Sequence, residues 1–151
     1  MNLSDDFHDL LAAFENSQAE YLLIGGYAVT LHSEPRYTKD IDLWIGSSAE
    51  NLERVAAALE AFGAPASAID DVKTCAADEI VCNGSPPGRV DILKSIPGIE
   101  FADAYSNRVA IRLGEVTASV ISIADLITAK TAAGRPQDLV DVAALRAVQE
   151  E

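Results

Sequence analysis

Three aspartates stand within short apolar stretches and are the residues whose type and spacing could do chemistry. Asp40 and Asp42 alternate with apolar residues at positions 40–45, and Asp91 lies in a second apolar stretch at 89–93. Successive side chains of a β-strand point to opposite faces, so Asp40 and Asp42 should share one face while the apolar residues face the core. The sequence therefore predicts carboxylates gathered on one surface of a sheet.

Carboxylates that share one face repel one another and raise each other's pKa. A divalent cation relieves this repulsion, and carboxylate oxygens are ligands that Mg²⁺ or Mn²⁺ accepts. Two such ions about 3.5–4 Å apart can hold the attacking and leaving oxygens of an in-line phosphoryl displacement. We therefore expect a magnesium- or manganese-dependent site. The alternative is that the acids solvate an exposed strand face and a strand end.

A Gly-Gly pair precedes the first two aspartates. Residues 21–24 form an apolar run typical of a buried strand, Gly25 and Gly26 interrupt it, and residues 27–32 can form a short helix. A turn of this kind lets backbone N–H groups approach a phosphate at the positive end of a helix. Most Gly-Gly pairs are turns without ligands, so the pair gains meaning only from the aspartates downstream.

The rest of the chain predicts alternating helices and strands, with no repeat, low-complexity tract or linker. An amphipathic helix should follow Ser4, and Ser47 with Glu50 forms a capping box for a helix ending at Gly63. The middle of the chain, 64–87, gives little signal apart from a strand at 79–82. Further elements are expected as a strand at 89–93, a short helix near 101–105, a hairpin of 108–113 with 116–121, and helices at 122–132 and 136–149. We expect a single domain over residues 1–151 of α/β (α+β) class, with helices at the C-terminal end.

The net charge and the cysteines limit which ligands and which cellular location we expect. The net charge is −13, from 24 acidic and 11 basic residues, and it disfavours broad nucleic-acid binding while allowing a nucleotide bound through metal ions. Cys75 and Cys82 lack metal-site spacing and suit small hydrophobic residues in a reducing compartment. The acidic N-terminus does not read as a signal peptide, and no apolar run has the length of a membrane span, so a cytoplasmic location is expected.

Together these residues resemble the nucleotidyltransferase superfamily, whose pattern is an apolar strand, Gly-Gly or Gly-Ser, a short helix, an acid-x-acid strand and a later single acid. The string GGYAVTLHSEPRYTKDIDLWI at 25–45 and the ending KTAAGRPQDLVDVAAL at 130–145 are similar to the AbiEii-type branch, which includes nucleotidyltransferase toxins of toxin–antitoxin systems. The resemblance covers nearly the whole chain except 64–87. It implies a nucleotidyltransferase fold, with a mixed central β-sheet flanked by helices.

The resemblance also assigns roles to the acidic and glycine residues. Asp40 and Asp42 would ligate magnesium, and Asp91 would be the third ligand or the general base for an acceptor hydroxyl. Gly25 and Gly26 would hold the triphosphate of a bound nucleoside triphosphate.

Four further residues receive nucleotide-binding roles from the resemblance. Arg36 and Thr38, just before the acidic pair, would touch phosphate, although an arginine in such a loop is often only solvated. Lys130 would reach the triphosphate and Asp138 would orient it through an ion pair, a role that leaves stability nearly independent of Lys130. The alternatives are a solvated surface amine for Lys130 and a partner of the helix dipole for Asp138.

Three hypotheses for function remain open. The first is an enzyme that moves a nucleoside monophosphate from a nucleoside triphosphate to an acceptor hydroxyl on an RNA end, a protein or a small molecule. The second is a nucleotide- or partner-binding module without turnover, working with a cognate antitoxin or as a homodimer. The third is a sugar- or antibiotic-modifying transferase with a pocket for a small acceptor.

Three aromatic residues are expected to be structural. His8 and His32 have no accompanying partner motif. Trp44 shares the face of Asp42 and could stack on a base, but packing in the core is the simpler interpretation.

Overall fold

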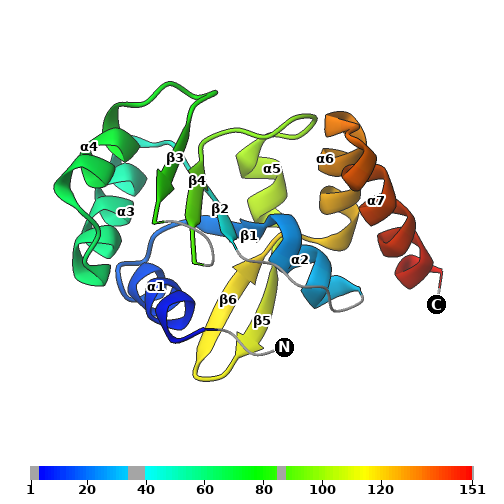
Figure 1. Cartoon of the computed structure of the whole chain (residues 1–151), viewed down its shortest axis with the longest axis horizontal. Helices are drawn as coiled ribbons and strands as arrows, with labels where there is room; N and C mark the ends of the chain where they lie inside the picture. The colour runs from blue at the N-terminus through cyan, green and yellow to red at the C-terminus, as the bar shows by residue number, and fades with distance from the viewer. Residues whose placement is uncertain (1–3, 34–39, 85–87, 151) are drawn as a thin grey trace.

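The computed structural model describes residues 4–33, 40–84 and 88–150, which form a six-stranded sheet with helices on both sides (Figure 1). The strands are β1 Tyr21–Ile24, β2 Ile41–Ile45, β3 Ile80–Asn83, β4 Val90–Leu93, β5 Val109–Leu113 and β6 Val116–Val120. The helices are α1 Asp5–Asn16, α2 Gly25–His32, α3 Ala49–Phe62, α4 Ala66–Thr74, α5 Phe101–Ser106, α6 Ile123–Ala133 and α7 Pro136–Gln149. None of the described helices is both long and apolar enough to cross a membrane.

The sheet is mixed, as the sequence resemblance implied. Its strand order is β3-β4-β2-β1-β6-β5. The pairs β2–β4 and β1–β6 are parallel, and the pairs β1–β2, β3–β4 and β5–β6 are antiparallel. The first two strands of the chain therefore lie at the centre, where each has neighbours on both sides.

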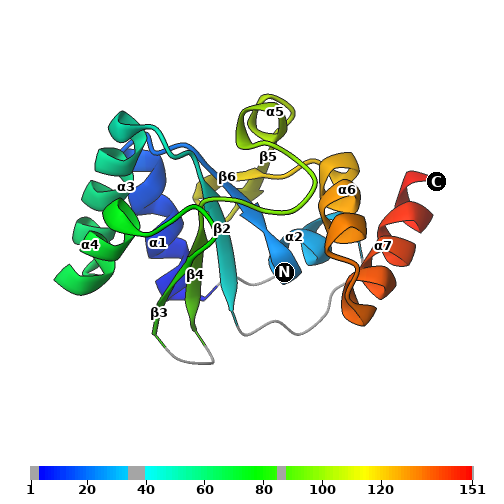
Figure 2. The ribbon, with the colours of Figure 1, turned by 90° about the horizontal axis from the view of Figure 1, so that it is seen from above.

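Six of the seven described helices divide into two groups. Helices α1, α3 and α4 lie together on one side of the sheet, and α2, α6 and α7 lie on the other (Figures 1 and 2). In β2, Ile41, Leu43 and Ile45 are fully buried. They alternate with Asp42, which lines a pocket together with residues of α6 and α7, so these three apolar side chains face the opposite group of helices.

Helix boundaries follow local capping chemistry, with one correction to the sequence analysis. Ser4 caps α1 as expected, through a hydrogen bond of 3.2 Å from the backbone N–H of Phe7. The predicted capping box of Ser47 and Glu50 is wrong, because Ser48 is the N-cap of α3 and accepts from the backbone N–H of Asn51 at 3.1 Å. Both serines are residue types that favour an N-cap position, and the buried side chain of Asn51 lies in the first turn of the helix that Ser48 caps.

The segment that gave little sequence signal contains helix α4 and strand β3. Helix α4 packs on α3 and buries only Ala68 and Val72. So small an apolar face produces a weak helical pattern, which explains why the sequence analysis missed it. The strand expected at 79–82 is present at the edge of the sheet, next to β4.

Asn51 joins three parts of the scaffold behind the aspartates. Its side chain is almost fully buried, and its Oδ1 accepts from the backbone N–H of Glu20 at 2.7 Å. Its Nδ2 donates to the carbonyls of Glu20 at 3.0 Å and Gly46 at 2.8 Å. One amide thus ties the start of β1 to the end of β2 and to α3.

We predict that Asn51→Ala lowers the free energy of unfolding by about 2–4 kcal/mol, because buried backbone groups of two strands lose their partners at once. Urea denaturation measures this change. Asn107→Ala is the matched control, since Asn107 is exposed at the end of α5 and its loss should cost less than about 0.5 kcal/mol. Equal effects of the two substitutions would show that Asn51 does not hold the strands together.

Candidate active site

Strand register brings two of the three predicted aspartates side by side. In the parallel pair of β2 and β4, Asp42 lies directly opposite Asp91. Cross-strand partners point to the same face of a sheet, so both carboxylates project to the side of α2, α6 and α7. Asp40 precedes β2 and lies one side-chain repeat from Asp42, and all three aspartates line one pocket. The predicted carboxylate constellation is therefore brought together by the fold.

Gly25 lies against the carboxylate of Asp42. Strand β1 pairs with β2 so that Ile24 lies opposite Asp42, and helix α2 begins at the next residue. Gly25 has φ +70°, and a Cβ atom at this position would collide with Asp42 Oδ2. Only glycine combines this backbone conformation with so close an approach. Gly25 is thus packed onto the acidic cluster.

Arg89 joins this cluster and was missed by the sequence analysis. Its Nη2 lies 3.0 Å from Asp91 Oδ2 and 3.6 Å from Asp40 Oδ2. The signal was present in the sequence, because Arg89 and Asp91 are two residues apart and share one face of a strand. The site consequently contains its own cation, in contact with two of the three acids.

Burial and neighbouring charge alter the protonation of Asp42. Desolvation, followed by the negative charges of Asp91 and Asp40, raises the pKa of Asp42 to about 6, and Lys130 opposes the rise. An acid whose pKa is raised by like charges lacks sufficient positive charge nearby. The centre of the cluster therefore has room, in electrostatic terms, for a further cation.

The aspartates form the floor of a pocket of about 660 Å³, a volume suited to a nucleotide. Its walls are the first residues of α2, the residues after β4, and the facing sides of α6 and α7. Apolar surface comes from Leu93, Ile96, Pro97, Leu126 and Ala129. Positive charge comes from Arg89, Lys130 and Arg135. An anionic ligand with an apolar portion fits this distribution.

The first turn of α2 opens into the same pocket. Its N-cap, Ile24, offers no side-chain hydrogen bond, and Ile24, Gly25 and Gly26 line the pocket. The first N–H groups of a helix have no partners within the helix, and they carry its positive dipole end. This helix start is suited to binding an anion beside the aspartates.

The donor chemistry of the cluster fits a hard divalent cation. Asp91 Oδ1 is buried and has no hydrogen-bond partner within residues 4–33, 40–84 and 88–150. In the same described part of the chain, no three His, Cys, Asp or Glu side chains are already arranged as a ligand set. Arg89 instead bridges Asp40 and Asp91. The three aspartates thus offer the oxygen ligands that a divalent cation prefers, and Arg89 contacts two of them, Asp40 and Asp91.

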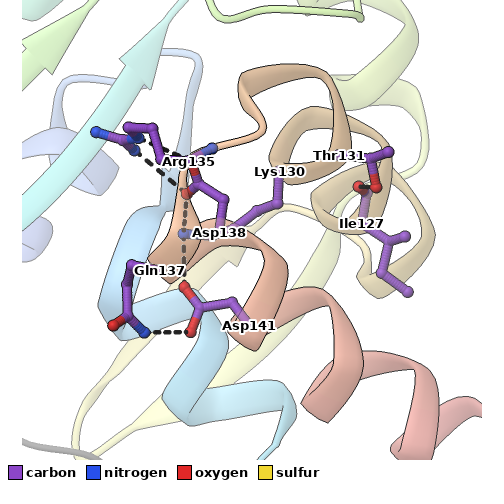
Figure 3. A network of polar contacts seen from close by, with 7 residues as sticks. All are labelled: Ile127, Lys130, Thr131, Arg135, Gln137, Asp138 and Asp141. Carbon is purple, nitrogen blue, oxygen red and sulfur yellow. Dashed lines mark hydrogen bonds and ion pairs between the residues drawn. The ribbon is translucent and has the colours of Figure 1, made fainter.

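Lys130 is held by two buried acids on α7 (Figure 3). Its Nζ lies 2.9 Å from Asp141 Oδ2 and 3.4 Å from Asp138 Oδ1, and its side chain is only 11% exposed. The surface-amine alternative is therefore wrong, and the buried ion pairs lead us to expect that Lys130 contributes to stability. Gln137 donates to Asp141 Oδ1 at 3.1 Å and completes this network. The predicted ion pair of Lys130 with Asp138 is confirmed, and the closer partner Asp141 was missed.

Asp138 links the pocket to the start of α7. It accepts from the backbone N–H of Arg135 at 3.2 Å and from Arg135 Nε at 2.7 Å. These contacts, with the Arg135 side chain first, hold the pKa of Asp138 below its usual value. Asp138 thus lies at the helix terminus as expected and contacts Lys130, while its role toward a triphosphate stays a prediction, and Arg135 is a further pocket cation.

The other residues singled out in the sequence either do not line the pocket or lie outside the described residues. Arg36 and Thr38 lie beyond the described residues. Trp44 is buried and packs edge-on against Phe101 with ring centroids 5.2 Å apart, which confirms the packing interpretation. His32 contacts the carbonyl of Ile121 at 2.6 Å through Nε2, and His8 lies near Asp9 on the surface.

Comparison with known proteins agrees with this geometry. A solved structure of ANT(2″)-Ia in complex with adenylyl-2″-tobramycin matches with a TM-score of 0.52 and 17% identity, covering 93% of this chain and 95% of that one. At this identity the likeness supports the fold. No curated protein matches the sequence.

A family model described as "Nucleotidyltransferase of unknown function (DUF6036)" matches residues 2–150. This match confirms the superfamily expected from the sequence, and the AbiEii-type branch stays a prediction. Because the model spans almost the entire chain, the protein belongs to this family of nucleotidyltransferases of unknown function.

Proposed function

We propose that this protein transfers a nucleoside monophosphate from a nucleoside triphosphate to an acceptor hydroxyl and releases pyrophosphate. The observation that carries the proposal is the register of β2 and β4, which sets Asp42 opposite Asp91 on the floor of a pocket with cationic walls. A Mg²⁺ or Mn²⁺ ion held by Asp40, Asp42 and Asp91 would neutralise charge on the transferred phosphoryl group and its leaving oxygen. Asp91 is the alternative candidate for the base that accepts the proton of the acceptor hydroxyl.

The other residues of the pocket act on the triphosphate. Gly25 and Gly26 offer backbone N–H groups at the start of α2, where the helix dipole also favours negative charge. Lys130, aimed by Asp138 and Asp141, supplies positive charge for the phosphates that leave as pyrophosphate. The apolar wall formed by Leu93, Ile96 and Leu126 would accommodate the base or sugar.

The acceptor is the finer part of the proposal. An RNA end, a protein side chain and a small molecule each carry a suitable hydroxyl, and a toxin–antitoxin role would follow from the first two. The fold shared with ANT(2″)-Ia, whose structure holds adenylyl-2″-tobramycin, supports keeping a small-molecule acceptor in the test. The net charge of −13 argues against an extended nucleic-acid groove, so an RNA acceptor would be engaged at its end.

Incubation with each α-labelled nucleoside triphosphate, magnesium, and separate pools of RNA, protein and small metabolites tests this proposal. Label should move to one pool only, which identifies the acceptor class and the preferred base. Nucleotide binding without label transfer to any pool would favour the alternative of a binding module on the same fold.

We predict that Asp42→Asn abolishes Mn²⁺ binding measured by isothermal titration calorimetry. The same substitution should lower transfer roughly a hundredfold to a thousandfold, as loss of one electrostatic stabiliser typically does. Asp78→Asn is a matched control, since Asp78 is an exposed residue before β3 and does not line the pocket. Unchanged Mn²⁺ affinity in Asp42→Asn would place the cation elsewhere.

The raised pKa of Asp42 gives a pH-dependent prediction for the metal-free protein. The folded protein binds this proton up to a pKa of about 6, against 3.8 for an ordinary aspartate, so the stability from Asp42 is present below about pH 4 and is lost as pH rises past 6. Wild type should therefore lose up to about 3 kcal/mol relative to Asp42→Asn between about pH 4 and pH 7.5. Urea unfolding in a chelator measures both proteins. A stability difference that stays constant with pH would contradict the burial of Asp42.

Lys130→Ala should lower transfer on the order of a hundredfold, since one positive charge at the phosphates is lost. It should also destabilise the fold, by about 2–4 kcal/mol, because Asp138 and Asp141 stay buried without it. Lys130→Arg is the matched control, because it keeps the charge and should restore most of the stability. If Lys130→Ala unfolds at the same temperature as wild type, burial of Asp138 and Asp141 does not require the positive charge of this lysine.

A further inference from the structure

We propose that Arg89 takes the place of the divalent cation in the metal-free protein and moves to the triphosphate when metal and nucleotide bind. This inference rests on the proposed metal site and adds a positioning residue to it. Arg89 would therefore couple the binding of the two ligands, so that the metal ion alone binds weakly and binds better when a triphosphate is present.

The first step is the position of Arg89 on the sheet. Because Ile41 lies opposite Val90 in the parallel ladder, the residues just before them, Asp40 and Arg89, also lie side by side. The backbone is fixed here, since the N–H of Ile41 donates to the carbonyl of Arg89 at 2.9 Å. Arg89 thus projects from the sheet beside the carboxylates and into the same pocket.

The second step is the pair of contacts that Arg89 makes. One nitrogen, Nη2, serves both Asp91 Oδ2 at 3.0 Å and Asp40 Oδ2 at 3.6 Å. A divalent cation bound by these two acids would lie close to the guanidinium and would repel it, even if it used the other oxygen of Asp91. Arg89 and the metal ion therefore compete for the negative charge of the same two carboxylates.

The third step is where the guanidinium goes. Its side chain is 39% exposed, so it is not enclosed by the protein. Arg89 Nε is buried and has no hydrogen-bond partner among the described residues, so the flat guanidinium is only partly satisfied by the two acids. A triphosphate in the same pocket offers oxygens in the geometry that a guanidinium binds in a two-pronged manner. Contacts of the guanidinium with triphosphate oxygens would thus replace its contacts with Asp40 and Asp91.

The neighbouring cations do not share this arrangement. Lys130 is enclosed by Asp138 and Asp141, and Arg135 contacts Asp138 through Nε at 2.7 Å. Both are bound to acids outside the proposed metal ligands. Arg89 is the cation whose partners, among the described residues, are the proposed metal ligands themselves.

The test compares wild type with Arg89→Gln by titration calorimetry, using Mn²⁺ alone and then inorganic tripolyphosphate in saturating Mn²⁺. Removal of the competing charge should tighten Mn²⁺ binding roughly tenfold, and loss of the phosphate partner should weaken tripolyphosphate binding roughly tenfold. Tripolyphosphate carries no base or acceptor, so the result does not depend on nucleotide preference. Arg112→Gln, on an exposed position of β5, removes the same charge far from the pocket and should change neither affinity.

Two outcomes would overturn the inference. Equal or weaker Mn²⁺ binding by Arg89→Gln, with clear binding by wild type, would mean that Arg89 does not compete with the metal, and it would leave the proposed function intact. No Mn²⁺ binding by either protein would remove the metal site and the proposed function together. Arg89→Lys guards against a folding defect, because it keeps the charge and should bind Mn²⁺ alone as weakly as wild type.

Discussion

Parallel pairing of β2 with β4 sets Asp42 opposite Asp91. This register brings two like charges together, and the rest of the pocket surrounds them. Burial and mutual repulsion raise the pKa of Asp42 to about 6. Arg89 contacts Asp91 at one side of the cluster, and Gly25, which follows β1, packs onto Asp42. No side chain can enter at Gly25, so the acid is confined between a helix start and its charged neighbour.

Positive charge is distributed around the pocket by two different kinds of contact. Lys130 is enclosed between Asp138 and Asp141, an arrangement that fixes its direction and makes its charge part of the fold. Arg89 is more exposed and contacts the acids on the sheet itself. In a chain of net charge −13, these cations gather positive charge around one pocket, as the proposed binding of a triphosphate requires. In the proposed function, the fixed cation would act by preorganisation, whereas the exchangeable one would respond to metal binding.

Packing around the pocket provides rigidity. Asn51 ties the ends of β1 and β2 to α3, and Trp44, on the same face as Asp42, packs against Phe101 of α5. These contacts hold the central strands in register, and register is what keeps two carboxylates adjacent. The arrangement concentrates electrostatic strain at the site while the apolar core on the opposite face supplies stability, a division common among enzymes.

The sequence by itself determined the elements whose signals are local. Alternation of polar and apolar residues predicted the strands that carry Asp42 and Asp91, and the Gly-Arg-Pro stretch predicted the break before α7. The glycine pair predicted the end of β1, but the expected turn is wrong, because both glycines lie in the first turn of α2, which begins at Gly25. Only the tertiary structure decided that Asp42 and Asp91 are register partners, that Arg89 contacts two of the acids, and that Asp141 is the closer partner of Lys130. Helix α4 and the choice of Ser48 over Ser47 were also decided there. The reason is physical, because propensity and periodicity act over a few neighbouring residues, whereas strand register and ion-pair geometry depend on packing between segments far apart in the chain.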